Sequence, residues 1–260
     1  MILSRRVSFN GVMLDELDDS IVIRSLDPGV PKETTNATDK MGGWGQRVTG
    51  QHWSTLEATV TFAIDIPKRE MNRRREVFDL AIAWAANKKG WLEFNTITDR
   101  NLWIDKVVIP GGGDMWNWTN EFTFIFRAYS VPFWKSITPT SVTVNSVSSY
   151  GIPMDIGGTA PGVLDVSFKN VSGATIQNIA ITAAGKTLTL NGVNLTASET
   201  LSITHPHDTG GLLRIYAGGR NVYGLRTGAD DLVVYPGRVN VVLSASRAGN
   251  LTVTNYARWL

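Results

Sequence analysis

Hydrophobic and polar residues alternate along most of this chain, as they do in half-buried β-strands. In the first half, "RVSFNGVML", "SIVIRSL" and "LEATVTFAIDI" alternate in this way, and Asn10-Gly11 predicts a tight turn inside the first segment. The segment "GWLEFNTITDRNLWIDKVVI" predicts a hairpin that turns near residues 98–100. An aromatic series from Trp116 to Phe126 in "WNWTNEFTFIFRAYSV" predicts one side of a long strand.

The period changes to that of a helix between about residues 68 and 89. Asp65 and Pro67 predict its start, and the basic and glycine residues "KKG" predict its end. We expect three adjacent arginines, residues 73–75, to lie on a solvated face with partial pairing to nearby glutamates, because adjacent helical positions cannot form one binding stripe. The face expected to point to the core contains Met71, Phe78, Ile82 and Ala85.

The segment from residue 28 to residue 54 has no sustained period of either kind. It is rich in Gly, Pro, Thr and Asn, yet it carries two tryptophans in "GGWGQRVTGQHWS". Loops of this length inside a compact domain are uncommon and usually functional, and tryptophan is enriched where proteins contact proteins. We therefore predict a long loop that acts as an interface with a partner. Its predicted contact residues are Trp44, Arg47 and Trp53.

The second half predicts strands throughout. Alternating segments recur about every 8–12 residues, separated by Asn, Gly, Asp and Ser, which is typical of an antiparallel β-sandwich or jelly roll. Residues 1–135 hold 17 of the 25 Lys and Arg residues and eight of the nine tryptophans. This imbalance predicts two domains, residues 1–135 and 136–260. We place the linker in "VPFWKSITPTS", where Pro132 and Pro139 disfavour strand pairing.

Composition narrows the class of protein further. With 43% hydrophobic and 18% charged residues, the chain is typical of a globular protein, and its net charge of +2 lacks the basic excess of a nucleic-acid-binding protein. It has no cysteine, which excludes disulfides and thiolate chemistry. No apolar stretch reaches the ~20 residues of a membrane span, and "MILSRRVSFNG" does not resemble a signal peptide, so we expect synthesis in the cytosol.

Candidate catalytic groups are few. The cluster "HPHD", with His205, His207 and Asp208, has metal-ligand residue types, but a polar turn is the favoured interpretation over a zinc site. Acidic pairs at residues 15–16, 18–19 and 230–231 are interpreted as solvated turns rather than as a general acid and base. The glycine runs lack the Lys-Ser/Thr of a phosphate-binding loop, and no G-x-S-x-G is present. We predict no catalytic residue, no metal site and no cofactor, and hence no enzyme.

The order of these features resembles the distal tail proteins of long-tailed, non-contractile bacteriophages. In the first half the resemblance rests on "FNG", the long arm-like loop, "TLEATVTFAI", one helix, "LEFNTITDRNLWIDKVVI" and "VPFW". In the second half it rests on "GTAPGVLDVSFKN", "LSITHPHD" and "LVVYPGRVNVVLSASRAGNLTVTNYARWL". The chain departs from the family pattern at Leu56-Glu57, where a basic residue is expected.

The resemblance implies a mainly β protein: an N-terminal β-rich (α+β) domain with one long helix, followed by a C-terminal galectin-like antiparallel β-sandwich. It also implies a hexameric ring at the distal end of the tail tube, in a virion assembled in the host cytoplasm. The partners it implies are further copies of the chain, the tail tube protein and the tail-associated hub protein, and it leaves open docking by receptor-binding proteins. In such a ring, Trp44 and Trp53 are expected to anchor in the neighbouring subunit.

A carbohydrate-binding, lectin-like role of the second domain is the alternative, with the host cell wall as its target. Sugar sites need an exposed aromatic platform beside clustered polar side chains. The aromatic residues available in this domain are Tyr150, Tyr216, Tyr223, Tyr235, Tyr256 and Trp259.

Overall fold

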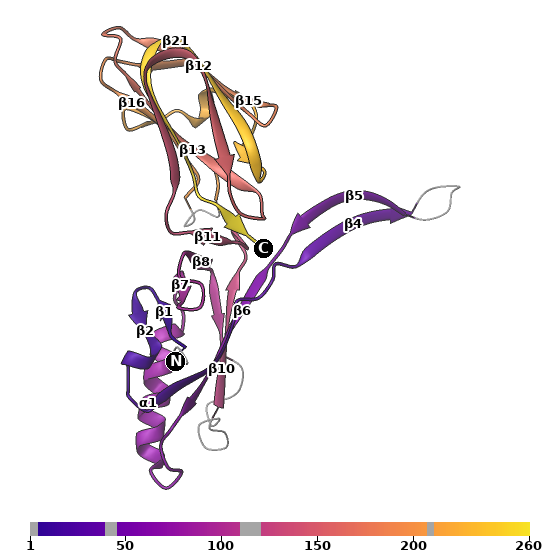
Figure 1. Cartoon of the computed structure of the whole chain (residues 1–260), viewed down its shortest axis with the longest axis vertical. Helices are drawn as coiled ribbons and strands as arrows, with labels where there is room; N and C mark the ends of the chain where they lie inside the picture. Colours follow the sequence, from indigo (N-terminus) through magenta and orange to yellow (C-terminus); the bar gives the residue numbers. More distant parts are fainter. Residues whose placement is uncertain (1–4, 40–45, 110–120, 207–210) are drawn as a thin grey trace. The chain divides into compact units, whose positions relative to one another are not determined.

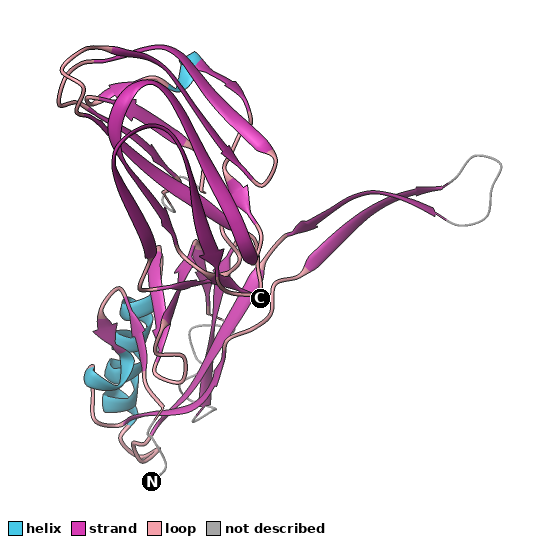
Figure 2. Ribbon diagram, turned by 45° about the horizontal axis from the view of Figure 1, so that its top comes forward, coloured by secondary structure: helices cyan, strands magenta, loops and turns pink. Residues whose placement is uncertain are grey.

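The computed structural model of the chain divides into two compact units (Figure 1). The N-terminal unit is Met1–Trp134 and the C-terminal unit is Lys135–Leu260. The structure describes residues 5–39, 46–109, 121–206 and 211–260, and for residues 36–39 and 46–52 it describes the backbone only. Strands dominate both units, and a single α-helix occurs among these residues (Figure 2). This agrees with the predicted mainly β fold. Within the described part of the chain, no helix is both long and apolar enough for a membrane span.

Two antiparallel sheets form the body of the N-terminal unit. One contains strands in the order β2-β1-β7-β8 and the other in the order β3-β6-β10-β9. Asn10 and Gly11 both have positive φ, 54° and 79°, and form the predicted turn between β1 and β2. The strands are β1 (Val7–Phe9), β2 (Val12–Met13), β3 (Ile21–Asp27), β6 (Leu56–Ile64), β7 (Gly90–Phe94), β8 (Arg100–Ile104), β9 (Lys106–Val108) and β10 (Glu121–Ala128).

Helix α1 (Met71–Ala85) is shorter than predicted. It begins after Glu70, with no side-chain cap, and it ends before the basic residues that were expected to close it. The predicted core face is confirmed at Phe78 and Ala85, Ile82 is half-buried, and the prediction is wrong at two positions. Met71 is exposed, whereas Arg74 is 2% exposed and donates a hydrogen bond from Nη1 to the Ile66 carbonyl at 2.9 Å. The buried residues of α1 are Arg74, Val77, Phe78, Ala81, Trp84 and Ala85.

Aromatic rings join α1 to both sheets. Trp84 packs edge-to-face on Phe9 of β1 and Phe126 of β10, with ring centroids 5.8 and 5.9 Å apart. Its indole N–H donates to the Val12 carbonyl at 2.9 Å, so the buried indole is also satisfied as a donor. Phe78 contacts Phe122 at 4.6 Å. The predicted aromatic side of β10 therefore faces the core from Phe122 to Phe126, whereas Trp116 and Trp118 lie outside the described residues.

The predicted irregular loop at residues 28–54 is wrong in its main part. Strands β4 (Glu33–Asp39) and β5 (Gln46–Trp53) form an antiparallel hairpin there. Their sequences, "ETTNATD" and "QRVTGQHW", show no apolar alternation, and among the described residues the two strands belong to neither sheet of the body. We call β4 and β5 the arm hairpin.

The C-terminal unit is the predicted antiparallel sandwich. Its buried residues form one continuous apolar cluster that includes Leu164, Phe168, Leu190 and Leu243. The strands are β12 (Thr140–Ile156), β13 (Gly162–Asn170), β14 (Ile176–Ala183), β15 (Lys186–Leu195), β16 (Thr200–Thr204), β17 (Arg214–Ala217), β18 (Arg220–Asn221), β19 (Arg226–Gly228), β20 (Val233–Val234), β21 (Gly237–Asn255) and β22 (Arg258–Trp259).

Strand β21 connects the two layers of this sandwich. Its first part pairs with β14, which continues into β15 and β19, and its last part pairs with β13, which continues into β16, β17 and β18. Along nearly its whole length the opposite edge of β21 pairs with β12, from Thr140↔Asn255 to Ile156↔Gly237. The two long strands form a ribbon that belongs to both layers (Figure 1).

The predicted linker "VPFWKSITPTS" is more structured than expected. Strand β11 (Trp134–Ser136) and the beginning of β12 lie inside it. The Ser136 amide donates to the Ala257 carbonyl at 2.9 Å, which ties the start of the C-terminal unit to its end. The two prolines therefore do not keep this segment free of strands.

Candidate functional site

The arm hairpin is the feature of the N-terminal unit that most needs a partner. Among the described residues, β4 and β5 pair with each other and with no third strand, and they extend away from the sheet that contains β6 (Figures 1 and 2). A two-stranded hairpin is at best marginally stable alone in water, because it needs a third strand or a packed layer to hold it. Such a hairpin is suited to contact another molecule.

The structure places the three predicted contact residues at different points of this hairpin. Trp44 lies outside the described residues. Arg47 is in β5, opposite Thr38 of β4 in the backbone register. Trp53 is the last residue of β5, and its half-buried ring packs edge-to-face on Phe133 at 6.2 Å. Trp53 thus has an aromatic partner within its own unit.

Several contacts fix the place where the arm hairpin leaves the sheet, which we call the arm root (Pro28–Lys32 and Trp53–Thr55). The Lys32 amide donates to the Thr55 carbonyl at 2.8 Å and the Ser54 amide to the Lys32 carbonyl at 2.9 Å. The Trp134 indole N–H donates to the Pro28 carbonyl at 3.0 Å. These hydrogen bonds hold the two segments of the root together and attach the root to the body of the unit.

Charged groups on β6 and β10 support the same root. The Glu57 carboxylate forms ion pairs with Arg127 of the sheet, 2.9 Å from Nε, and with Lys32 of the root, 3.6 Å from Nζ. A hydrogen bond with the Tyr129 side chain, together with the charge of Glu57, raises the pKa of Arg127. The acid occupies the position at which the resemblance led us to expect a basic residue. In this chain the basic residue at this place is Arg127, which belongs to the neighbouring strand β10.

Gly29 permits the closest approach at the arm root. Its φ is +66°, and a Cβ built on it would lie 2.0 Å from the Glu57 carbonyl oxygen. We expect Gly29→Ala to destabilise the chain by more than the ~1–2 kcal/mol that a left-handed alanine costs, because the clash adds to the strain. We also expect faster hydrogen exchange at the Lys32 and Ser54 amides. Mass-spectrometric hydrogen exchange and thermal unfolding measure the two effects.

The matched control for this prediction is Gly11→Ala. Gly11 has a similar φ of +79°, but no atom lies within 4 Å of the place that a Cβ would occupy, so this variant bears the strain without the clash. Equal exchange at the root amides in the two variants would show that the close approach at Gly29 does not position the arm hairpin.

Of the cluster "HPHD", the structure describes only His205 and Pro206. His205 is buried, and Asp165 Oδ1 accepts from its backbone amide at 3.0 Å and lies 3.2 Å from its Nδ1. His207 and Asp208 lie outside the described residues. Within the described ranges, no group of three His, Cys, Asp or Glu residues is placed to hold a metal ion. His205, just after β16, therefore helps to hold β16 against β13 through Asp165.

Each acidic pair has a basic or hydroxyl partner close by. Asp15 and Glu16 both bind Arg6, at 2.8 and 2.5 Å. Asp18 accepts from Ser20 and pairs with Arg73, and the Ser20 hydroxyl is the main cause that lowers the pKa of Asp18. These contacts are those of turns tied to neighbouring elements.

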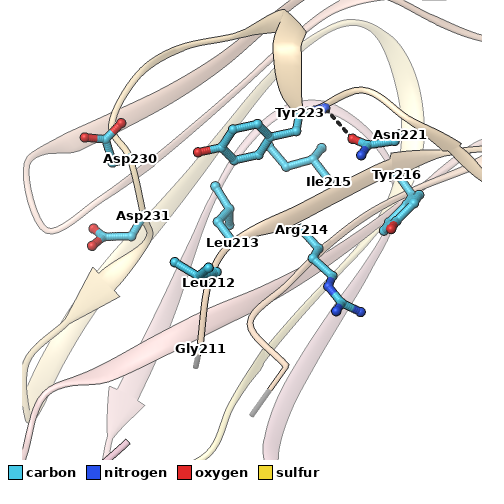
Figure 3. Close-up of a pocket in the computed structure, with 10 residues that line it drawn as sticks. All are labelled: Gly211, Leu212, Leu213, Arg214, Ile215, Tyr216, Asn221, Tyr223, Asp230 and Asp231. Atoms are coloured by element: carbon cyan, nitrogen blue, oxygen red, sulfur yellow. Dashed lines mark hydrogen bonds between the residues drawn. The ribbon is translucent and has the colours of Figure 1, made fainter. Parts of the chain in front are cut away.

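A pocket of about 520 Å³ opens in the C-terminal unit, and the sequence did not predict it (Figure 3). Leu213 and Ile215 of the β17 region form its apolar floor, being 9% and 1% exposed. Tyr223 lies over this floor, and its hydroxyl points to the side on which Asp230 and Asp231 lie (Figure 3). We call this site the tyrosine pocket. Its lining residues are Gly211, Leu212, Leu213, Arg214, Ile215, Tyr216, Asn221, Tyr223, Asp230 and Asp231.

Two of the tyrosines considered for a sugar platform, Tyr216 and Tyr223, line this pocket. The acidic pair 230–231, interpreted from the sequence only as a turn, is beside them. Tyr216, Tyr223 and Asp230 lie close together in the sequence, and this proximity could have indicated that they share one site. Nothing in the residue pattern, however, indicated that β17 would supply an apolar floor below them.

Comparison with solved structures identifies the fold. The chain is similar to the crystal structure of SPP1 Dit (gp 19.1), described as a paradigm of the hub adsorption apparatus in phages that infect Gram-positive bacteria. The TM-score is 0.67 at 15% sequence identity, covering 98% of this chain and 99% of that one. The resemblance expected from the order of elements is thereby confirmed at the level of the fold, over essentially the whole chain.

Weaker likenesses are to the phage P2 baseplate in its activated conformation with Ca and with Sr. Their TM-scores are 0.41 and 0.39, at 9% and 10% identity, which is too low to support an inference. No protein-family model and no curated protein sequence matches the chain.

Proposed function

We propose that this protein is a structural subunit of a phage virion, located at the tail tip, where six copies form a ring at the distal end of the tail tube. The observation that carries the proposal is the arm hairpin, a two-stranded sheet anchored at its root and paired with no further strand of the described chain. The whole-length likeness to SPP1 Dit supports the same role, since that protein is described as part of a hub adsorption apparatus.

In the proposed ring, the arm hairpin of one subunit packs on the body of the next. A ring of identical subunits closes through heterologous contacts, in which an element of one subunit meets a different surface of its neighbour. Arg47 of β5 is a proposed contact residue of the arm, and Trp44, which lies outside the described residues, is proposed from the sequence. Trp53 is the proposed contact residue at the root, where its ring also packs on Phe133.

The proposed partners on the two sides of the ring are the tail tube protein and the tail-associated hub protein, and the C-terminal sandwich is a proposed platform for receptor-binding proteins. The role is scaffolding without catalysis. The ion pairs of the acidic residues and the contact between His205 and Asp165 support this assignment, because these side chains hold turns and strands together.

The mass of the purified chain in solution, followed by negative-stain imaging, tests the proposal. We expect a species of six times the 28.5 kDa chain mass, and images of rings with six-fold symmetry and an open centre. A chain that remains monomeric at the highest attainable concentration, and that antibodies do not locate at the tail tip of the virion, would contradict the proposed role.

A further inference from the structure

The tyrosine pocket has the dimensions of a small-molecule site and lies outside the proposed ring contacts. At about 520 Å³ it falls within the range of pockets that bind small ligands. It belongs to the C-terminal unit alone, so its ligand does not depend on the arm hairpin.

The pocket combines an apolar floor with an aromatic ring that is accessible from solvent. Leu213 and Ile215 are buried below, whereas Tyr223 is 41% exposed. The Arg226 guanidinium lies over the Tyr223 ring, 4.8 Å from its centroid, and helps to orient it. The Tyr223 amide also donates to Asn221 Oδ1 at 3.0 Å, which fixes the short 3-10 turn that carries the ring. A ligand therefore meets a ring held in place.

The carboxylates at the rim are balanced by cations of the same chain. Asp230 is paired with Arg226 at 2.5 Å, and Asp231 with Lys186 at 3.4 Å. Figure 3 shows the Arg214 side chain pointing away from Tyr223 and the two aspartates. With two cations for two carboxylates, this side of the pocket has no excess charge to attract an ion. It keeps carboxylate oxygens that accept further hydrogen bonds, because a carboxylate offers about four acceptor positions.

We propose that the tyrosine pocket binds a neutral saccharide. The apolar C–H face of a sugar ring packs against Tyr223, since the face of an aromatic ring is its electron-rich side. Hydroxyl groups of the sugar donate to Asp230 and Asp231, which form stronger hydrogen bonds than neutral acceptors do. A cationic peptide would instead have to displace Arg226 and Lys186 from their partners, so the ion pairs favour the neutral ligand.

Titration of the full-length protein with glucose, galactose and N-acetylglucosamine, followed by saturation-transfer NMR, tests this assignment. We expect at least one of these sugars to bind with a millimolar Kd that is insensitive to added salt, because the ligand carries no charge. Tyr223→Ala should weaken the binding about tenfold, as expected for loss of an aromatic contact. Asp231→Asn should weaken it as well, and because the Asp231 side chain is 42% exposed and keeps its shape in asparagine, we expect the fold to remain intact.

Tyr235→Ala is the matched control. Tyr235 is 62% exposed and does not line the pocket, so this variant should bind as the unaltered protein does. Three results would overturn the assignment: no binding of any of the three sugars, equal affinity in the Tyr223 and Tyr235 variants, or salt-sensitive binding of tetralysine that depends on Asp230 and Asp231. A protein that forms rings but fails these tests keeps its proposed role in the tail and loses only this site.

Discussion

Shortening the arm hairpin is expected to abolish the ring and leave a folded monomer. The variant replaces residues 36–50 with an Asn-Gly turn that joins Thr35 to Gln51, two residues that already face each other in the register of β4 and β5. The hairpin adds no residue to either sheet of the N-terminal unit, so its outer part can be removed without opening the core. Light scattering after size-exclusion chromatography measures the assembly, and circular dichroism measures the fold.

The expected loss is large because every subunit of the proposed ring would use the same contact. Truncating an interface anchor costs about 2 kcal/mol or more, and in a closed ring the cost recurs at each of the identical interfaces. Trp44→Ala with Arg47→Ala should therefore shift the equilibrium in the same direction. Trp53→Ala should in addition lower the thermal stability of the monomer, because its ring packs on Phe133. Rings that persist after the hairpin is shortened would show that another surface closes them.

Arg74→Ala is expected to destabilise the N-terminal unit strongly. Its side chain is 2% exposed and donates to the Ile66 carbonyl in the segment that leads from β6 to α1. Removal leaves a cavity and an unsatisfied carbonyl, which together cost about 3–5 kcal/mol. Arg74→Met, which keeps most of the volume but not the donors, should recover part of that loss. Denaturant unfolding of the three proteins gives the free energies.

Arg75→Ala is the control for this prediction, because it removes the same side chain one position further along the helix. Arg75 is 64% exposed, and its ion pair with Asp79 spans 3.7 Å. We therefore expect the free energy of unfolding to change by less than about 0.5 kcal/mol. If the Arg74 and Arg75 variants unfold at the same denaturant concentration, the buried guanidinium contributes nothing to stability.

The contrast between these two arginines shows why the face of α1 could not be predicted in full. The run of three arginines indicates a solvated surface, and for Arg73 and Arg75 that is what the structure has. The burial of Arg74 depends on a carbonyl eight residues away that the bend before α1 brings underneath it. A tertiary contact of this kind leaves no periodicity in the sequence.

Strands were predicted well where one of their faces is buried and poorly elsewhere. The segment "GVLDVSFKN" coincides with β13, whose alternate residues from Gly162 to Asn170 are buried. The second half was expected to be β throughout, but its first alternating segment begins only at "GVLDVSFKN". The 17-residue strand β12 before it was not identified, because most of its residues before Ile152 are Ser, Thr, Asn or Gly and are exposed. Its conformation comes from backbone pairing with β21, as that of β4 comes from pairing with β5. The first part of β12 and the strands β4 and β5 consist mainly of polar residues, so they leave no hydrophobic pattern to detect.

The ribbon of β12 and β21 gives the sandwich a mechanical direction. The chain enters the C-terminal unit beside Thr140 and leaves it beside Asn255, and these residues pair at the same end of the ribbon. A force that pulls the two ends of the unit apart would peel β12 from β21 one hydrogen bond after another. A force between that end and the far end, near Ile156 and Gly237, would act along the strands and strain many hydrogen bonds at once. The sandwich should therefore resist a pull on the end near Ile156 and Gly237 far better than a pull that separates its two termini.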